Sequence, residues 1–205
     1  MMRGRFITLE GIDGAGKSSH LRWITRFLRG RGIRVKVTRE PGGTPVGEKL
    51  RRLVLGSRQR LHVETEALLM FAARREHLAK VIGPALERGI WVLCDRFTDA
   101  TYAYQSGGSG VPWDKVSALE QWVHPGFQPD LTILFDVSPA IGRERTGRKR
   151  NLDRFEREQG AYYRRVRDAY RRRAARDTGR IRILDAQGSL SEVRKKLEII
   201  LSKFC

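Results

Sequence analysis

A glycine-rich motif near the start of the chain restricts the possible folds more than any other feature. Its eight residues are Gly11, Ile12, Asp13, Gly14, Ala15, Gly16, Lys17 and Ser18. They match the pattern G-x-x-x-x-G-K-[ST], with a hydrophobic run before it and an amphipathic segment after it. Between a strand and a helix, such a loop turns backbone N–H groups inward, where they cradle phosphate oxygens. The motif therefore predicts a phosphate-binding loop that joins a buried strand to a helix.

The side chains of this loop suggest which phosphates it binds. Lys17 would place a positive charge near the β- and γ-phosphates of a nucleoside triphosphate, and Ser18 would offer its hydroxyl to Mg²⁺. Asp95, at the end of a later hydrophobic run, would help to hold the same ion, through water. We predict that ATP contacts the whole segment 11–19, which includes Ser19.

Hydrophobic and amphipathic segments alternate along the rest of the sequence. The expected strands are 5–10, 34–38, 90–94, 131–135 and 181–184. The expected helices are 18–29, 46–55, 65–87, 113–123, one that begins at Pro139, 156–176, and one capped by Ser189 with Glu192. Strands joined by such helices form a parallel sheet through right-handed crossovers. We predict an α/β fold of the P-loop NTPase type: three layers, αβα, with a five-stranded parallel sheet covered on both faces, in one domain over 1–205.

The chain carries a formal net charge of +18, and segment 143–182 contributes much of it, with sixteen basic and six acidic residues. Such a region could bind nucleic acid, or it could be a phosphate-handling lid followed by an arginine-rich solvated helix. Aromatic residues are sparse within 164–176, so we do not expect a nucleic-acid partner. No apolar run approaches the length of a membrane span, and two cysteines do not make a disulfide framework. We therefore predict no membrane partner and a cytoplasmic protein.

Two other classes of phosphate-loop protein fit the sequence poorly. Regulatory GTPases need an Asn-Lys-x-Asp guanine reader, and the sequence has none. Motor-type ATPases usually carry Glu directly after the magnesium-associated Asp, whereas Arg96 follows Asp95 and Val137 follows Asp136. A small kinase is the simplest remaining interpretation.

Four segments carry a resemblance to a known family: 11–19, 38–44, 95–105 and 152–156. Over essentially its whole length, the chain resembles thymidylate kinases of the bacterial type. The runs 39–44 and 95–105 together distinguish that family from guanylate and adenylate kinases. The resemblance implies Mg²⁺-assisted, in-line transfer of the γ-phosphate of ATP to dTMP, in the biosynthesis of dTTP. It also implies a homodimer, formed through the helices around 65–87 and 113–123.

The resemblance also implies which residues bind the acceptor nucleotide. They are Asp13, Arg51, Phe71, Arg75, Arg96, Thr101, Tyr104 and Gln105. Phe71 would stack on thymine and Arg75 would bind its O4 atom, because residues four apart share a helical face. The alternative is that Phe71 is core and Arg75 is solvated. Arg51 and Arg96 would hold the acceptor phosphate, and Asp13 would face the acceptor sugar and phosphate.

Position 14 bears on the mechanism, because some family members carry arginine there and this chain has glycine. Members that lack it supply a transition-state arginine from a lid, predicted here at about 143–156. Arg148 or Arg150 would act there, as a catalytic group beside Lys17, Arg96 and Asp13. Arg145, or Arg143 two residues earlier, would stack on adenine, and Gln187 would contact the adenine edge. The rivals are another nucleoside monophosphate kinase, a deoxynucleoside kinase and a nucleic-acid-binding ATPase.

Overall fold

The computed structural model describes residues 3–56, 61–147 and 154–205, with only the backbone described for 154–159. The predicted lid residues Arg148 and Arg150 lie outside the described residues. Five strands form the sheet: β1 (Phe6–Glu10), β2 (Val35–Arg39), β3 (Trp91–Asp95), β4 (Leu131–Asp136) and β5 (Ile181–Asp185). Each lies within one or two residues of its predicted position.

The sheet is parallel throughout and has the strand order β2-β3-β1-β4-β5. β1 lies at the centre and is fully buried, so its hydrophobic run needs no polar alternation. β1 lies between β3 and β4. The next strands along the chain, β2 and β3, lie on one side of β1, and β4 and β5 lie on the other, so the strand order switches direction at β1. In such sheets ligands bind at the carboxyl ends of the strands beside the switch point. The phosphate-binding loop and Asp95 both follow strands at this edge.

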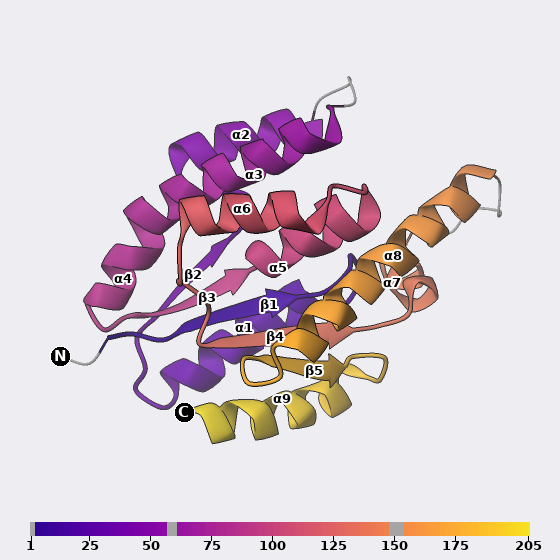
Figure 1. Cartoon of the computed structure of the whole chain (residues 1–205). Coiled ribbons are helices and arrows are strands. Elements are labelled where there is room, and N and C mark those ends of the chain that lie inside the picture. The colour runs from indigo at the N-terminus through magenta and orange to yellow at the C-terminus, as the bar shows by residue number, and fades with distance from the viewer. Residues whose placement is uncertain (1–2, 57–60, 148–153) are drawn as a thin grey trace.

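Helices cover both faces of the sheet. They are α1 (Lys17–Arg29), α2 (Pro45–Gly56), α3 (Val63–His77), η1 (Leu78–Ile82), α4 (Gly83–Glu87), α5 (Thr98–Thr101), η2 (Tyr102–Gly108), α6 (Trp113–Val123), α7 (Pro139–Arg145), α8 (Arg154–Arg176) and α9 (Leu190–Phe204). Figure 1 shows α1 and α9 on one side of the sheet, with α3, α4, α6 and α8 on the other. The predicted three-layer arrangement is confirmed. Among the described helices, none is long and apolar enough to cross a bilayer.

Two helical regions differ from the sequence prediction. The predicted helix 65–87 is a run of three segments, in which the π-helical turn η1 separates α3 from α4. The prediction also assigned no helix to 98–108, where α5 and η2 follow β3. Gly107 and Gly108 permit close packing of η2 on α8, since an added Cβ would lie 2.4 Å from the Ala169 side chain and 2.6 Å from the Tyr162 ring. This contact between distant segments has no local sequence signal.

Candidate active site

Two cavities open at the carboxyl edge of the sheet. The larger, of about 680 Å³, is lined by Asp13, Gly14, Gly16, Lys17, Ser18, Ser19, His20, Arg51, Asp95, Arg96, Arg145, Ala186, Gly188, Ser189, Leu190 and Val193. The smaller, of about 310 Å³, is lined by Asp13, Glu40, Pro41, Arg51, Leu55, Glu66, Met70, Arg74, Arg96, Phe97, Ala100, Thr101, Tyr104, Gln105 and Tyr162. We name them the loop cavity and the side cavity. Asp13, Arg51 and Arg96 line both, so the two cavities meet at these three side chains.

The backbone of the phosphate-binding loop depends on glycine at position 14. Gly14 has φ 77°, and a Cβ added there would lie 2.0 Å from the carbonyl oxygen of Gly142 in α7. Any side chain at this position would displace α7 and would also be strained by the left-handed backbone. An arginine therefore does not fit here, and the source of a transition-state arginine stays a prediction.

Lys17 begins α1 and lies within the loop. Its Nζ donates hydrogen bonds to the carbonyl oxygens of Gly11, at 2.9 Å, and Ile12, at 3.0 Å. Burial, together with the nearby charge of Arg96, lowers the pKa of Lys17 to about 8. An anion entering the loop cavity would favour the charged ammonium and offer it stronger acceptors than two carbonyls.

Ser18 and Asp95 line the loop cavity together. Asp95 ends β3, and its buried Oδ1 has no hydrogen-bond partner among the described residues. A buried carboxylate oxygen of this kind is suited to a cation or its bound water. The described residues contain no cluster of three or more His, Cys, Asp or Glu side chains that could hold a metal by themselves. The pair therefore fits Mg²⁺ that arrives with phosphates and keeps several waters.

Arg145 closes one end of the loop cavity against the segment that follows β5. Its guanidinium donates to the carbonyl oxygens of Ala186, Gln187 and Gly188, at 2.8 to 3.1 Å. These contacts bring the end of α7 to the loop that begins α9, where Ala186 and Gly188 line the cavity. The predicted contact residue Gln187 adjoins the cavity without being among its lining residues.

Arg96 lies at the junction of the cavities in a network of polar contacts. Its Nη2 donates to Asp13 Oδ1, at 2.7 Å, and to the Tyr104 hydroxyl, at 2.9 Å. The guanidinium also lies over the Tyr104 ring, 4.5 Å from its centroid. Burial favours loss of its charge, but two phenol oxygens and the Asp13 carboxylate raise the pKa of Arg96 well above its ordinary value. The junction therefore holds a fixed cation.

Arg74 extends from α3 to the wall of the side cavity. Its Nε donates to Glu40 Oε2, at 2.8 Å, and its Nη2 donates to the Thr101 hydroxyl, at 3.1 Å. Its side chain is only 3% exposed, and its Nη1 is buried with no hydrogen-bond partner among the described residues. The Phe71 and Phe97 rings lie 4.7 and 5.1 Å from the guanidinium carbon. A rigid, partly satisfied donor in a concave site is a candidate for recognition of a ligand carbonyl.

Comparisons with known proteins accord with this geometry. A family model described as thymidylate kinase matches residues 9–197. The chain belongs to the thymidylate kinase family. It is 62% identical over 197 residues to a thymidylate kinase of Nitrosospira multiformis, with 96% of each chain covered. It is 59% identical to a thymidylate kinase of Methylobacillus flagellatus, over 99% of each chain. A crystal structure of thymidylate kinase from Ehrlichia chaffeensis superimposes with a TM-score of 0.80 at 32% identity, covering 98% of this chain and 99% of that one.

The structure places Phe71 and Arg75, which were predicted to bind the acceptor base, outside both cavities. Phe71 is 1% exposed and packs in the core with Tyr102, Val111 and Val116. Arg75 is exposed, and neither residue lines the side cavity. The side chains that line it from α3 include Met70 and Arg74, one position earlier. Both pairs are four residues apart, so helical spacing alone cannot tell which pair faces the cavity.

The other predicted acceptor residues lie around the side cavity or at the junction. Thr101, Tyr104 and Gln105 line the side cavity, and the Gln105 amide donates to Glu66 Oε1, at 2.6 Å. Arg51 donates to the carbonyl oxygen of Pro41, at 2.8 Å. The sequence analysis did not assign a site role to the lining residues Glu40, Pro41, Leu55, Glu66, Met70, Arg74, Phe97, Ala100 and Tyr162. The sequence marks Glu40 and Pro41 only as members of the segment 38–44, because the burial that pairs the Glu40 carboxylate with Arg74 is visible only in the fold.

Proposed function

We propose that the chain transfers the γ-phosphate of ATP to dTMP, forming ADP and dTDP, with ATP in the loop cavity and dTMP in the side cavity. Phosphoryl transfer is mainly a problem of bringing two anions together in line. The observation that carries the proposal is the junction, where Arg51 and Arg96 line both cavities and where the donor and acceptor phosphates would meet. The whole chain, 1–205, acts as one kinase unit in this proposal.

Arg74 identifies the acceptor base in this proposal. Its Nη1, which has no hydrogen-bond partner among the described residues, would donate to a carbonyl such as O4 of thymine. Cytosine presents an amino group at the equivalent position, so two donors would face each other and both would stay unpaired. A site built to form such a bond rejects an analogue that cannot form it far more strongly than it rejects the loss of one methyl group. Thr101 and Gln105 would complete the polar surroundings of the base.

The remaining side chains would act on the phosphates. Lys17 and the loop N–H groups would hold the β- and γ-phosphates, and Ser18 and Asp95 would hold Mg²⁺, whose chemistry is to neutralise charge on the transferred group. Arg96 and Arg51 would orient the acceptor phosphate, with Asp13 beside the acceptor sugar. Arg148 or Arg150 would contribute the transition-state cation. Arg145 would flank the adenine, next to Gln187.

Rates of ADP release with different acceptors test the proposal. We expect dTMP to give the highest kcat/KM, with dUMP reduced about tenfold or more by loss of the methyl contact. We expect dCMP to fall at least about a hundredfold below dTMP, because the Arg74 donor is left unpaired. dAMP and dGMP should not react measurably in a cavity of about 310 Å³. Equal rates with every acceptor would refute the assignment. ATP hydrolysis that needs polynucleotide, without transfer to dTMP, would favour a nucleic-acid-binding ATPase instead.

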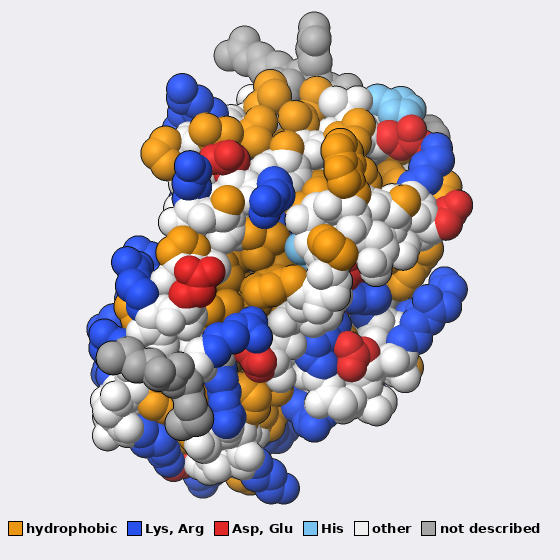
Figure 2. Space-filling model, turned by 60° about the vertical axis from the view of Figure 1, so that its left-hand side comes forward, with side chains coloured by type: hydrophobic (Ala, Val, Ile, Leu, Met, Phe, Trp, Pro, Cys, Tyr) orange, Lys and Arg blue, Asp and Glu red, His pale blue; other side chains and the backbone are white. Residues whose placement is uncertain are grey.

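The proposal extends to a cytoplasmic homodimer joined through α3 and α6. Support comes from large hydrophobic side chains exposed on these helices, with Trp122 80% and Leu68 52% exposed. Figure 2 shows hydrophobic side chains at the surface between scattered Lys and Arg side chains. Light scattering after size exclusion should report a dimer, which Trp122→Glu converts to a monomer. Ile199→Glu, which alters a side chain of α9 that is 59% exposed, should leave the dimer intact; dissociation by both or by neither would contradict this interface.

A further inference from the structure

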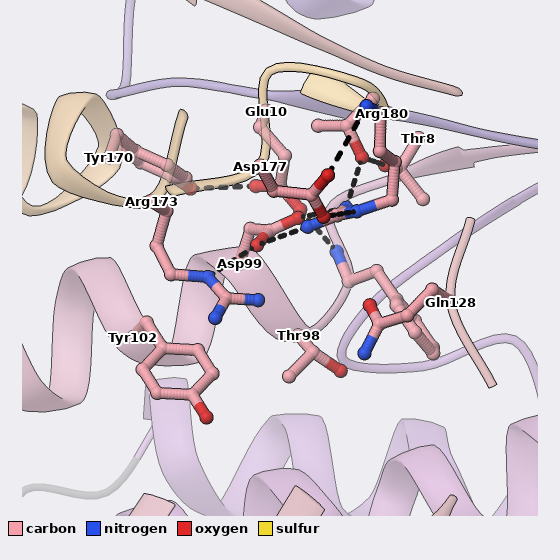
Figure 3. A network of polar contacts seen from close by, with 12 residues as sticks. Thr8, Glu10, Thr98, Asp99, Tyr102, Gln128, Tyr170, Arg173, Asp177 and Arg180 are labelled. Carbon is pink, nitrogen blue, oxygen red and sulfur yellow. Dashed lines mark hydrogen bonds and ion pairs between the residues drawn. The ribbon is translucent and has the colours of Figure 1, made fainter. Parts of the chain in front are cut away.

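A buried chain of hydrogen bonds lies behind Arg96. Arg96 Nη1 donates to the hydroxyl oxygen of Tyr170 in α8, at 3.2 Å. That hydroxyl in turn donates to Glu10 Oε2 at the end of β1, at 2.8 Å. The other carboxyl oxygen of Glu10 accepts the backbone N–H of Phe97, at 2.7 Å. Figure 3 shows the contact between Tyr170 and Glu10 within a wider polar network.

Neither Tyr170 nor Glu10 is placed to touch a nucleotide. Tyr170 is 2% exposed, Glu10 is 0% exposed, and neither lines the loop cavity or the side cavity. Placing a carboxyl group in a fully buried position is costly, and only well-made hydrogen bonds offset that cost. The hydrogen bonds of this carboxyl group lead to the side chain of Arg96, through Tyr170, and to the backbone beside it.

The backbone of Arg96 itself needs support. Its φ is 73°, the left-handed region, which costs roughly 1 kcal/mol or more for a residue other than glycine. The Arg96 N–H donates to the carbonyl oxygen of Leu9, at 3.0 Å, and the next N–H, of Phe97, donates to Glu10. Glu10 and the preceding strand residue therefore fix the point from which the Arg96 side chain leaves the backbone.

The position of Tyr170 is fixed independently by ion pairs on either side of it along the chain. Arg173, one turn later in α8, donates to Asp99 Oδ1, at 2.8 Å. Arg180, after the helix, binds the same carboxylate through two nitrogens, at 2.7 and 3.1 Å. Figure 3 shows Asp99 between these two arginines. In the opposite direction, Arg167 donates through two nitrogens to Asp136 at the end of β4, at 2.6 and 2.9 Å. The helix thus presents the Tyr170 hydroxyl at a defined place.

We propose that Tyr170, supported by Glu10, is a positioning residue that sets the orientation of the Arg96 guanidinium for phosphoryl transfer. A guanidinium is planar and forked, so fixing one terminal nitrogen fixes the direction of the other. Tyr170 holds Nη1 on the buried side, and this leaves Nη2 at the junction, beside Asp13 and Tyr104. The inference rests on the proposed role of Arg96 toward the acceptor phosphate. Small displacements of a positioning group reduce the rate more than they reduce binding.

The test compares two tyrosines that make the same kind of buried hydrogen bond. Tyr102 is also 2% exposed, and its hydroxyl donates to Glu120 Oε2, at 2.6 Å, but this contact does not lead to Arg96. Tyr170→Phe should lower kcat about tenfold while the KM for dTMP changes less than about threefold. Tyr102→Phe should leave kcat within about twofold of wild type, although both variants lower the melting temperature. Equal kcat values in the two variants would overturn the proposal.

A double-mutant cycle with Arg96→Lys separates positioning from general weakening of the fold. Lysine keeps the charge and loses the fork, so adding Tyr170→Phe to Arg96→Lys should change kcat less than about twofold. A full tenfold loss in that background would show that Tyr170 acts independently of Arg96, which would refute the inference. If Arg96→Lys lowers kcat while Tyr170→Phe alone does not, the positioning role fails and the proposed function stands. If Arg96→Lys has wild-type kinetics, the role of Arg96 itself fails.

Discussion

The two cavities are built in different ways although they share a boundary. Gly14, Gly16, Lys17, Ser18 and Ser19, all from one contiguous segment, form much of the loop cavity. The side cavity instead combines side chains from α2, α3, α8 and the segment after β3. A backbone loop is encoded by its own glycines, whereas an assembly of side chains depends on how several helices are rotated against one another. This difference explains why sequence motifs predict the residues of the loop cavity and locate those of the side cavity only approximately.

The largest effect should come from the loop cavity. Lys17→Ala removes the one lysine among the described residues that line it, and we expect kcat to fall by about a thousandfold, as for loss of a preorganised charged donor in a catalytic site. Lys36→Ala, at an exposed position in β2, should be close to wild type. Steady-state kinetics with saturating ATP and dTMP measures both, and thermal denaturation checks that each variant is folded. Wild-type turnover of Lys17→Ala would mean that phosphate is held in another way.

The side cavity is tested by two adjacent arginines. Arg74→Ala should lower kcat/KM for dTMP by about a hundredfold, because it removes the proposed base contact and leaves the Glu40 carboxyl group buried without its main partner. Arg75→Ala, at the exposed neighbouring position, should change kcat/KM less than about threefold. Kinetics with dTMP as the varied substrate distinguishes the two. A large loss for Arg75→Ala with a small loss for Arg74→Ala would instead identify Arg75 as the base contact, with α3 rotated so that Arg75 faces the side cavity.

The register of α3 also shows how far sequence reasoning extends. The five strands, the capping box of Ser189 with Glu192 and the phosphate-binding loop depend on local patterns, and the structure has all of them. Arg74 and Arg75 differ only by a rotation of one residue about a helix axis, which tertiary packing decides. The π-helical segments η1 and η2 have no local signal for the same reason.

The basic region 143–182 posed a second problem for sequence reasoning. Its net charge suggested either a nucleic-acid surface or a solvated helix, and the structure reveals a third use. Arg167, Arg173 and Arg180 pair with carboxylates at the carboxyl ends of strands or just beyond them. Arg172 and Arg176 lie over the Trp113 ring, at 4.5 and 5.4 Å. Part of the positive charge therefore joins α8 to the rest of the fold, through partners far away in the sequence.

The last prediction concerns stability rather than turnover, and it tests the Glu10 carboxyl group that lies behind Arg96. Burial, with the nearby charge of Asp99, raises the pKa of Glu10 from 4.5 to about 8. The carboxyl group of Glu10 therefore holds its proton more tightly in the folded protein than in the unfolded chain. The resulting stability is complete below pH 4.5 and is lost as the pH rises to about 8. Glu10→Gln removes this titrating group. Between pH 4.5 and about 8, the unfolding free energy of the variant should therefore fall with pH less steeply than that of wild type, by up to about 1.4 kcal/mol per pH unit. Glu198→Gln, at an exposed position in α9, should keep the wild-type slope in urea unfolding. Equal slopes for Glu10→Gln and wild type would contradict the raised pKa.

A crystal structure with a bisubstrate analogue, adenosine and thymidine joined by a chain of phosphates, tests the account most directly. The account predicts adenosine at the Arg145 end of the loop cavity and thymine O4 within hydrogen-bond distance of Arg74. It also predicts that the phosphate chain passes Arg51 and Arg96 at the junction. An analogue that occupied one cavity only, or placed its thymine away from Arg74, would contradict it.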